Sequence, residues 1–184
     1  MMSMTGISKL MSLVLRHKPG ALNIVVDGHG WTDVATLIER INARQPFDRA
    51  MLEEIVRTDN KQRYAFSPDG TRIRANQGHS LPVDLELLPK TPPEVLWHGT
   101  GTKFVESIER QGLKRMGRQY VHLSADPETA VTVGRRHGKP ALFILDTARM
   151  TADGLEFYQA ENGVWLTNPV PPRYLTLTPI KSDR

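Results

Sequence analysis

The sequence contains no cysteine. Disulfide bonds, thiolate nucleophiles and cysteine-ligated zinc are therefore excluded. The six histidines form no His-Glu-x-x-His motif and no close pair, so we expect no metal site. The sequence also lacks an apolar run of the roughly 20 residues that a membrane-spanning helix needs, and it has no internal repeat or low-complexity tract. These absences favour a globular protein without a membrane partner.

The chain has no strong excess of charge of one sign. The net charge of +4 over 184 residues is split evenly between the two halves, so it permits an anionic partner without requiring one. The first fifteen residues resemble an amphipathic helix rather than a signal peptide, because polar residues interrupt the apolar ones. We therefore expect a cytoplasmic protein, and a monomer. The length allows one domain or two small ones.

Three amphipathic helices are predicted in the first half of the chain. Residues 1–15 have apolar residues at helical spacing, and Pro19 should end that helix. Thr32 and Asp48 are the predicted N-caps of the second and third helices. Between the first two helices, the β-branched run at residues 22–26 predicts a short strand.

A hairpin is predicted at residues 63–74, where two alternating segments flank a Pro-Asp-Gly turn. Because side chains alternate along a strand, we expect Tyr64, Phe66 and Ile73 to face the core. Arg63 should point the other way. Three helices followed by a two-stranded ribbon are the layout of a winged helix, which suggests nucleic-acid contact by fold analogy alone.

A proline-rich stretch divides the chain, and the sequence predicts an α+β protein of two domains. The predicted parts are a winged-helix domain over residues 1–80, a linker over 81–92 and a second α+β domain over 93–184. In the second domain the patterns predict strands at 95–98, 120–123 and 141–146, helices at 102–110 and 127–136, and short strands around Phe157 and Val164.

Cationic residues mark two places in the first half. Arg16 and His17 lie in the last predicted turn of the first helix, where the helix dipole alone gives cations a reason to be. An arginine fork beside a histidine also suits a phosphate. Arg63 enters the hairpin on the side nearest the helices, where it could converge with Arg16 to hold a dianionic phosphate.

Polar motifs in the second half also have two interpretations each. The stretch 98–102 is predicted to form a turn between a strand and a helix, which could present backbone N–H groups to a phosphate, although it lacks the third glycine of a dinucleotide-binding fingerprint. His122 and Ser124 should share one face of a strand, where a buried histidine is ordinary. Arg136 and His137 follow a helix, and residues 161–163 predict a type I′ hairpin turn.

Taken in order, seven motifs closely resemble the RNA 2′-phosphotransferase family, especially its bacterial and archaeal members. They are Leu-Arg-His-Lys-Pro at 15–19, Arg63 before Tyr-x-Phe, Arg-Ala-Asn-Gln-Gly-His-Ser at 74–80, Leu-Trp-His-Gly-Thr at 96–100, Tyr-Val-His-Leu-Ser at 120–124, Arg-His-Gly at 136–138 and Glu-Asn-Gly-Val-Trp-Leu-Thr at 161–167. The resemblance covers residues 8 to 177, nearly the whole chain.

The resemblance implies a winged-helix domain joined to an NAD-binding domain related to ADP-ribosyltransferases. It also implies a reaction in two steps on RNA that carries an internal 2′-phosphate, such as tRNA. The 2′-phosphate attacks the nicotinamide ribose of NAD and expels nicotinamide. The ribose 2″-hydroxyl then attacks the phosphorus, which releases RNA with a 2′-hydroxyl and ADP-ribose 1″,2″-cyclic phosphate. NAD is consumed as a co-substrate, and no metal is expected.

The same resemblance implies roles for individual residues. The family's catalytic set corresponds to Arg16, His17, Arg63 and Arg118, the last preferred over Arg115 because it directly precedes the strand at 120–124. Residues implied to contact NAD are His98, Gly99, Thr100, His122, Ser124, Arg136, His137 and Val164. The hydrophobic Val164 occupies the position of a glutamate in protein-modifying relatives, which argues against a protein acceptor.

Two other functions remain open on the sequence alone. An ADP-ribosyltransferase that caps a nucleic-acid 5′-phosphate would use the same NAD-binding half, but only the second step of the phosphotransferase clearly needs Arg16, His17 and Arg63. A winged-helix nucleic-acid-binding protein without catalytic activity would tolerate loss of His98 and Arg118, and its binding would depend strongly on salt.

Overall fold

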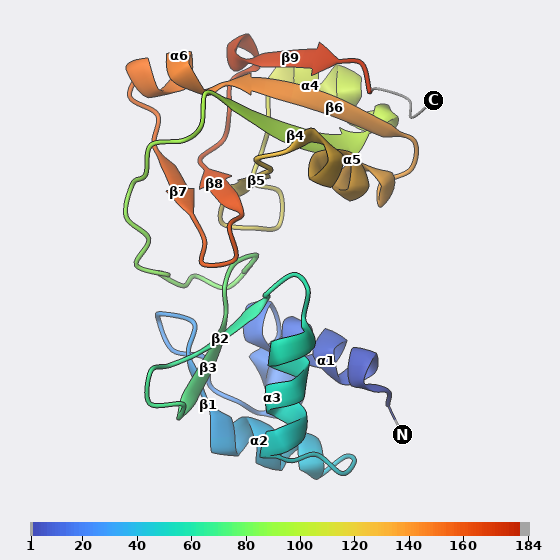
Figure 1. Ribbon diagram of the computed structural model, residues 1–184, viewed down its shortest axis with the longest axis vertical. Helices are drawn as coiled ribbons and strands as arrows, with labels where there is room; N and C mark the ends of the chain where they lie inside the picture. Colours follow the sequence, from blue (N-terminus) through green and yellow to red (C-terminus); the bar gives the residue numbers. More distant parts are fainter. Residues whose placement is uncertain (1, 181–184) are drawn as a thin grey trace. The chain divides into compact units, whose positions relative to one another are not determined.

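The computed structural model describes residues 2–180, and its chain divides into two compact units, Met1–Glu86 and Leu87–Arg184 (Figure 1). Residue 1 of the predicted first domain and residues 181–184 of the predicted second lie outside the described residues. Both units contain helices and antiparallel sheets, so the predicted α+β class is confirmed. The winged-helix and ADP-ribosyltransferase-like assignments stay predictions.

The first unit packs its helices against one small antiparallel sheet. Its elements are α1 (Met4–Arg16), the 3₁₀ helix η1 (Pro19–Leu22), β1 (Thr32–Asp33), α2 (Val34–Asn42), α3 (Arg49–Thr58), β2 (Tyr64–Phe66) and β3 (Arg72–Ala75). The sheet has the strand order β1-β3-β2, and both pairings are antiparallel. The two-residue strand β1 was not predicted from the sequence, because so short a segment carries no alternation.

Side-chain caps explain where the helices begin. Ser3 accepts a hydrogen bond from the Gly6 backbone at 3.2 Å, and Asp48 caps α3 as predicted, accepting from Met51 N at 2.9 Å. The predicted Thr32 cap of α2 is wrong by one residue. Asp33 is the cap, and its carboxylate accepts from Thr36 N at 2.7 Å.

The strand predicted at residues 22–26 is wrong. Leu22 ends η1, and Asn23 adopts a left-handed conformation with φ of 50°, which breaks the extended chain. Leu22 and Ile24 are still buried, whereas Val25 is 81% exposed. The apolar residues at 22 and 24 therefore serve the core of the unit without pairing into a sheet.

The predicted hairpin of the first unit is confirmed as β2 and β3, with Phe66 opposite Ile73. Gly70 has a φ of +70°, and its N–H donates to the Ser67 carbonyl at 2.8 Å, which closes the turn. Tyr64 and Ile73 are buried, and Phe66 packs against the same core. The hairpin thus anchors the segment that carries Arg63.

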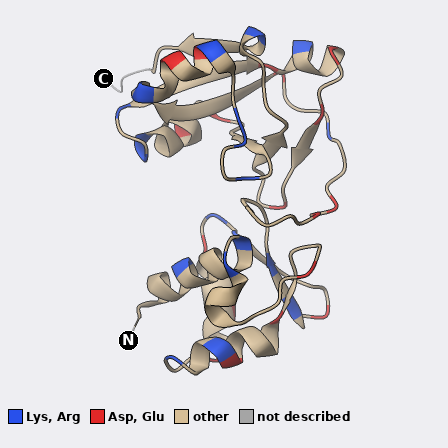
Figure 2. Ribbon diagram, turned by 180° about the vertical axis from the view of Figure 1, so that it is seen from behind, with Lys and Arg blue, Asp and Glu red and all other residues tan. Residues whose placement is uncertain are grey.

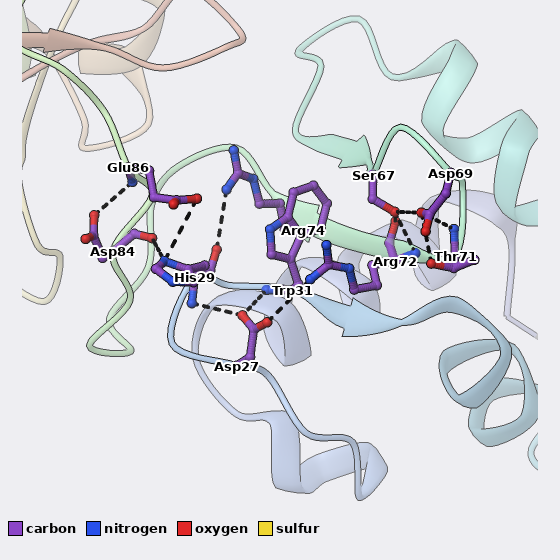
Figure 3. A network of polar contacts seen from close by, with 10 residues as sticks. All are labelled: Asp27, His29, Trp31, Ser67, Asp69, Thr71, Arg72, Arg74, Asp84 and Glu86. Carbon is purple, nitrogen blue, oxygen red and sulfur yellow. Dashed lines mark hydrogen bonds and ion pairs between the residues drawn. The ribbon is translucent and has the colours of Figure 1, made fainter.

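A polar network ties the end of the first unit to its sheet (Figure 3). Asp27 accepts from the backbone N–H groups of His29 and Trp31, each at 2.9 Å. His29 Nδ1 donates to the Asp84 carbonyl at 2.9 Å. That hydrogen bond and the nearby Glu86 carboxylate raise the pKa of His29. The segment around residue 84 is therefore attached to the loop that precedes β1.

Trp31 lies against two arginines of β3 (Figure 3). The guanidinium carbon of Arg74 is 4.4 Å from the Trp31 ring centroid, and that of Arg72 is 5.3 Å away. Arg74 is only 8% exposed, so its cation–π contact is part of the packing of the unit.

The predicted linker has no helix or strand, but part of it is packed. Val83 and Leu85 are buried, and Asp84 N donates to the Gly28 carbonyl at 2.8 Å. These contacts belong to the first unit.

The second unit is built around two antiparallel sheets, β4-β6-β9 and β5-β8-β7. Its elements are β4 (Val95–Gly101), η2 (Thr102–Phe104), α4 (Val105–Gln111), β5 (Val121–Leu123), α5 (Pro127–Arg135), β6 (Pro140–Asp146), α6 (Thr147–Ala152), β7 (Phe157–Gln159), β8 (Trp165–Thr167), η3 (Pro172–Tyr174) and β9 (Leu175–Thr178). The short helix α6 and the edge strand β9 were not predicted.

Two local predictions in the second unit need correction. The helix predicted at 102–110 is a 3₁₀ turn followed by α4, and no side chain caps the start of either. The type I′ turn predicted at 161–163 is wrong. Gly163 has a φ of +83°, but Asn162 does not have the positive φ that a type I′ turn requires.

Charged residues of both signs are interspersed within each unit (Figure 2). The buried apolar residues of the two units form separate clusters. The mixture of signs in each unit favours recognition of an anion by local groups of residues.

Candidate functional site

Arg16 and His17 lie together at the C-terminal end of α1. Arg16 is the last helical residue and is partly buried, whereas His17 is the C-cap and is exposed. The His17 N–H donates to the Leu13 carbonyl at 2.9 Å. The helix dipole favours cations at this end, and an anion that approaches it meets an arginine fork and an imidazole side by side.

Arg63 immediately precedes β2 and is held by Asp59. One carboxylate oxygen of Asp59 accepts from the Arg63 backbone N–H at 2.7 Å, and the other forms an ion pair with the guanidinium. The Asp59 side chain is 6% exposed and that of Arg63 is 32% exposed. Asp59 therefore orients an arginine that still reaches solvent.

Asn76 fixes the other side of the Arg63 segment. Its backbone N–H donates to the Arg63 carbonyl at 2.8 Å, and its side-chain amide donates to the Gln62 carbonyl at 2.6 Å. Gln62 has a φ of +43°, a conformation that costs free energy for a residue other than glycine. The backbone ahead of β2 is thus held in a strained turn that presents Arg63.

Arg16 and Arg63 both influence the pKa of one tyrosine. Burial raises the pKa of the Tyr64 hydroxyl, and the charges of Arg16 and Arg63 partly oppose that rise.

A cavity of about 330 Å³ opens beside Arg63. It is lined by Met4, Thr5, Ser8, Ile55, Thr58, Asp59, Asn60, Lys61 and Arg63. That the two guanidinium groups hold one phosphate stays a prediction.

His79 is a buried histidine behind the Arg16–His17 pair. It is 1% exposed, and neither ring nitrogen has a hydrogen-bond partner among residues 2–180. Burial, followed by the charges of Arg16, His17 and Arg74, lowers the pKa of His79 to about 4. His79 is therefore neutral at pH 7.

In the second unit, His98 and His122 are brought together by an isolated bridge between β4 and the end of β5. Trp97 and Ser124 exchange two backbone hydrogen bonds, each 2.9 Å. This register places His98 Nδ1 3.1 Å from the His122 carbonyl oxygen. The two histidines that the sequence motifs single out are therefore neighbours, although 24 residues separate them.

The hydrogen-bond partners assign opposite tautomers to these histidines. A carbonyl can only accept, so His98 carries its proton on Nδ1 and leaves Nε2 as an acceptor. Burial is the main cause that lowers the pKa of His98, so the ring is neutral. Arg118 donates to His122 Nδ1 at 2.6 Å, which leaves the proton of a neutral His122 on Nε2. The pair thus offers one acceptor and one donor to a bound molecule.

Arg136 and His137, which follow α5, affect the pKa values of Arg118 and His98 through their charges. Burial lowers the pKa of Arg118, and the charge of Arg136 lowers it further. The charges of His137 and Arg118 contribute to lowering the pKa of His98. The charge of Arg136 thus reaches Arg118. Contact of Arg136 and His137 with NAD stays a prediction.

The turn predicted at residues 98–102 is wrong. His98 to Gly101 lie inside β4, where they pair with residues of β6, so this stretch is not an open phosphate-binding turn. Gly99 is required for packing, because a Cβ there would lie 1.6 Å from the Ala130 carbonyl oxygen of α5. Thr100 is also buried. Contact of Gly99 and Thr100 with NAD stays a prediction.

Ser124 and Val164 flank the histidine pair. Val121 and Leu123 are buried and His122 is partly exposed, as the predicted alternation requires. Val164 directly precedes β8, and extending the register of β5 and β8 by one residue places it opposite Ser124. A valine at this position supplies no carboxylate to the site.

Sequence reasoning assigned no role to Asp59, His79 or Ser80, although the structure places Asp59 against Arg63 and Ser80 against His17. For His79 and Ser80 the available signal was the motif at residues 74–80, which directly follows the predicted hairpin that carries Arg63. No group of metal-binding side chains occurs among residues 2–180, and no described helix is long and apolar enough to cross a membrane.

Comparison with known proteins identifies the family of the chain. The model of the RNA 2′-phosphotransferase, Tpt1 / KptA family matches residues 2–169. The chain belongs to the RNA 2′-phosphotransferase family. A protein named probable RNA 2′-phosphotransferase from Agrobacterium fabrum is 52% identical over 175 residues, which cover 95% of this chain and 94% of that protein.

Two further relatives carry the same name. The one from Acaryochloris marina is 48% identical over 170 residues, covering 92% of this chain and 94% of its own length. The one from Flavobacterium johnsoniae is 48% identical over 171 residues, with the same coverage of 92% and 94%. Membership of the RNA 2′-phosphotransferase family makes this chain a transferase enzyme.

Proposed function

We propose that this protein removes an internal 2′-phosphate from RNA and consumes NAD in doing so. Membership of the RNA 2′-phosphotransferase family supports the transfer of the phosphate. The observation that best supports the use of NAD is the group formed by Arg118, His122 and His98. This group combines a cation with one neutral hydrogen-bond donor and one neutral acceptor. A ribose hydroxyl both donates and accepts, so it matches the two histidines.

The fold assignments belong to the same proposal. The first unit has three helices and a β2–β3 hairpin, which supports a winged helix that binds the phosphorylated nucleotide. The second unit has two small antiparallel sheets joined at the His98–His122 neighbourhood. This arrangement supports an ADP-ribosyltransferase-like domain that binds NAD.

In the first step the 2′-phosphate oxygen forms a bond to the ribose carbon of NAD as the bond to nicotinamide breaks. We assign the phosphate to Arg16 and Arg63, which would orient it and balance its charge. On the second unit, His98 Nε2 and His122 Nε2–H bind ribose hydroxyls. Arg118 and Arg136 offset the negative charge of the phosphates of NAD and of the adduct.

In the second step the ribose 2″-hydroxyl attacks the phosphorus, and the RNA 2′-oxygen leaves. The phosphorus gains negative charge on its oxygens during this step, which cations stabilise more strongly than they stabilise the ground state. His17 is the group beside the phosphate that can carry a proton near neutral pH. The products are RNA with a 2′-hydroxyl and ADP-ribose 1″,2″-cyclic phosphate.

The test of NAD use is the release of nicotinamide. We expect the protein to release nicotinamide from NAD when an oligonucleotide with one internal 2′-phosphate is present. The same oligonucleotide with a 2′-hydroxyl is the matched control and should give no release. Release that is equal with both oligonucleotides would show NAD hydrolysis instead. No release with either would remove NAD from the proposal.

A further inference from the structure

The segment that follows β3 caps the end of α1 at a residue assigned to the phosphate. The backbone N–H groups of Ser80 and Leu81 both donate to the Arg16 carbonyl, at 3.0 and 3.3 Å. The last carbonyls of a helix have no partner within the helix. Ser80 and Leu81 therefore satisfy the carbonyl of Arg16, the last residue of α1.

The same segment lies against the Arg16 side chain. Gly78 has a φ of +87°, and a Cβ at this position would lie 3.7 Å from the Cζ, Nε and Nη1 atoms of Arg16. The bare backbone of Gly78 is thus in the immediate neighbourhood of the guanidinium. A residue with a side chain would be strained here by the positive φ.

Ser80 also contacts the second residue of the pair. Its hydroxyl is hydrogen-bonded to His17 Nδ1 at 2.9 Å. Both Ser80 and His17 are exposed, so this hydrogen bond is not needed to satisfy a buried polar atom. Because Nδ1 is the ring nitrogen that contacts Ser80, Nε2 points away from Ser80.

The ends of the segment are fixed independently of these contacts. Asn76 is hydrogen-bonded to the carbonyls of Gln62 and Arg63, and Asp84 is hydrogen-bonded to the loop before β1. Between them in the chain, His79 is buried as a neutral ring. Ser80 therefore lies in a segment that is attached at both ends, which favours a fixed orientation of its hydroxyl.

We propose that Ser80 is a positioning residue for His17, and that its hydroxyl fixes the imidazole so that Nε2 faces the 2′-phosphate. The proposal rests on the proposed function, in which His17 acts beside that phosphate. The Ser80 hydroxyl restricts the rotation of the ring, and because a hydroxyl both donates and accepts it can do so for either tautomer. Its role is separate from that of the Ser80 backbone, which caps α1 whatever the side chain.

Because the hydroxyl and the backbone of Ser80 have separate roles, a substitution can remove one and keep the other. Ser80→Ala keeps the backbone cap and removes the hydroxyl, whereas Ser80→Thr keeps both. We expect Ser80→Ala to lower kcat about tenfold, the usual effect of losing one hydrogen bond, with KM for NAD unchanged. Ser80→Thr should restore most of the rate. The matched control is Ser107→Ala, the same change at an exposed position of α4, which should match the unsubstituted protein.

A second readout does not depend on activity. Nuclear Overhauser effects of the His17 ring report how the imidazole is oriented, and Ser80→Ala should change that orientation without changing Tm. An unchanged ring orientation together with an unchanged kcat would overturn the proposal. If the unsubstituted protein has no phosphotransferase activity, the proposed function fails instead, and the NMR comparison still shows whether Ser80 orients the ring.

Discussion

Arg118 donates a hydrogen bond to Nδ1 of His122 at 2.6 Å, and so fixes which nitrogen of a neutral His122 carries the proton. His122 in turn offers its backbone carbonyl to His98. Arg118 thus makes Nε2 of a neutral His122 a hydrogen-bond donor, while the backbone carbonyl of His122 makes Nε2 of His98 an acceptor. This relationship connects the segment before β5 to the proposed NAD site.

Replacing Arg118 should therefore have a large effect on catalysis. We expect Arg118→Ala to lower kcat/KM about 100-fold or more, because it removes a cation from the proposed phosphates and the partner of His122 Nδ1. The measurement is the steady-state rate with 2′-phosphorylated RNA and NAD. Arg115→Ala, in the same exposed segment, is the control and should retain full activity. Equal losses in both variants would contradict the assignment of Arg118.

Arg63→Ala should separate the two chemical steps. We expect nicotinamide release to continue and the RNA–phosphate–ADP-ribose adduct to accumulate, because the second step builds the most charge on the phosphate oxygens. Gel electrophoresis of end-labelled RNA would detect the adduct. Arg57→Ala, which removes an arginine ion-paired to Glu54 on the surface of α3, is the control. Normal turnover by Arg63→Ala would remove Arg63 from the site.

His79 predicts how stability depends on pH. Its folded-state pKa of about 4 lies below the ordinary value of 6.5, so the unfolded chain takes up the proton first. The free energy of unfolding is therefore unaffected by the titration of His79 above pH 6.5. It falls as the pH is lowered from 6.5 toward 4, by at most about 1.4 kcal/mol per pH unit. Urea unfolding at pH 7.5, 6 and 5 measures this.

The control for that experiment is His79→Gln, which does not titrate. It should show a flatter dependence of unfolding free energy on pH between 6.5 and 4. Asp33 and Asp69 also have lowered pKa values, but the stability they contribute is lost only below their ordinary value of 3.8. The lowered pKa of His98 acts in the same direction as that of His79, but equally in both proteins. The same slope in both proteins would show that His79 is not the group responsible.

Gly99→Ala tests whether this glycine serves packing or NAD. A Cβ would lie 1.6 Å from the Ala130 carbonyl oxygen, so β4 and α5 would have to separate. We expect a loss of at least about 2 kcal/mol of unfolding free energy, even without NAD. Gly117→Ala, where a Cβ meets nothing within 4 Å, should leave Tm unchanged. A Gly99→Ala protein of normal stability would show that the backbone approach is less tight.

The helices and the first hairpin could be predicted because their signals are local. Asp48 caps α3 by accepting from Met51, three residues further along the chain, and the β2–β3 turn consists of consecutive turn-forming residues. The strand predicted at 22–26 failed because apolar burial was mistaken for pairing. The backbone at Asn23 turns left-handed, and nothing in the apolar pattern reveals this.

The candidate site was only partly accessible from the sequence. Motif resemblance singled out His98 and His122, but their proximity depends on a bridge between Trp97 and Ser124, which are distant in the chain. The turn predicted at residues 98–102 failed because two glycines suggested a loop. In the structure the glycine at 99 lets a helix approach a strand. Such packing against a distant element leaves no trace in local composition.

The most direct test of the central claim follows the phosphorus atom. The substrate is an oligonucleotide whose single internal 2′-phosphate is labelled with ³²P, incubated with and without NAD. The account predicts that the label leaves the RNA only with NAD and appears in ADP-ribose 1″,2″-cyclic phosphate. Label released as inorganic phosphate without NAD, or label retained on RNA that carries ADP-ribose as a final product, would contradict it.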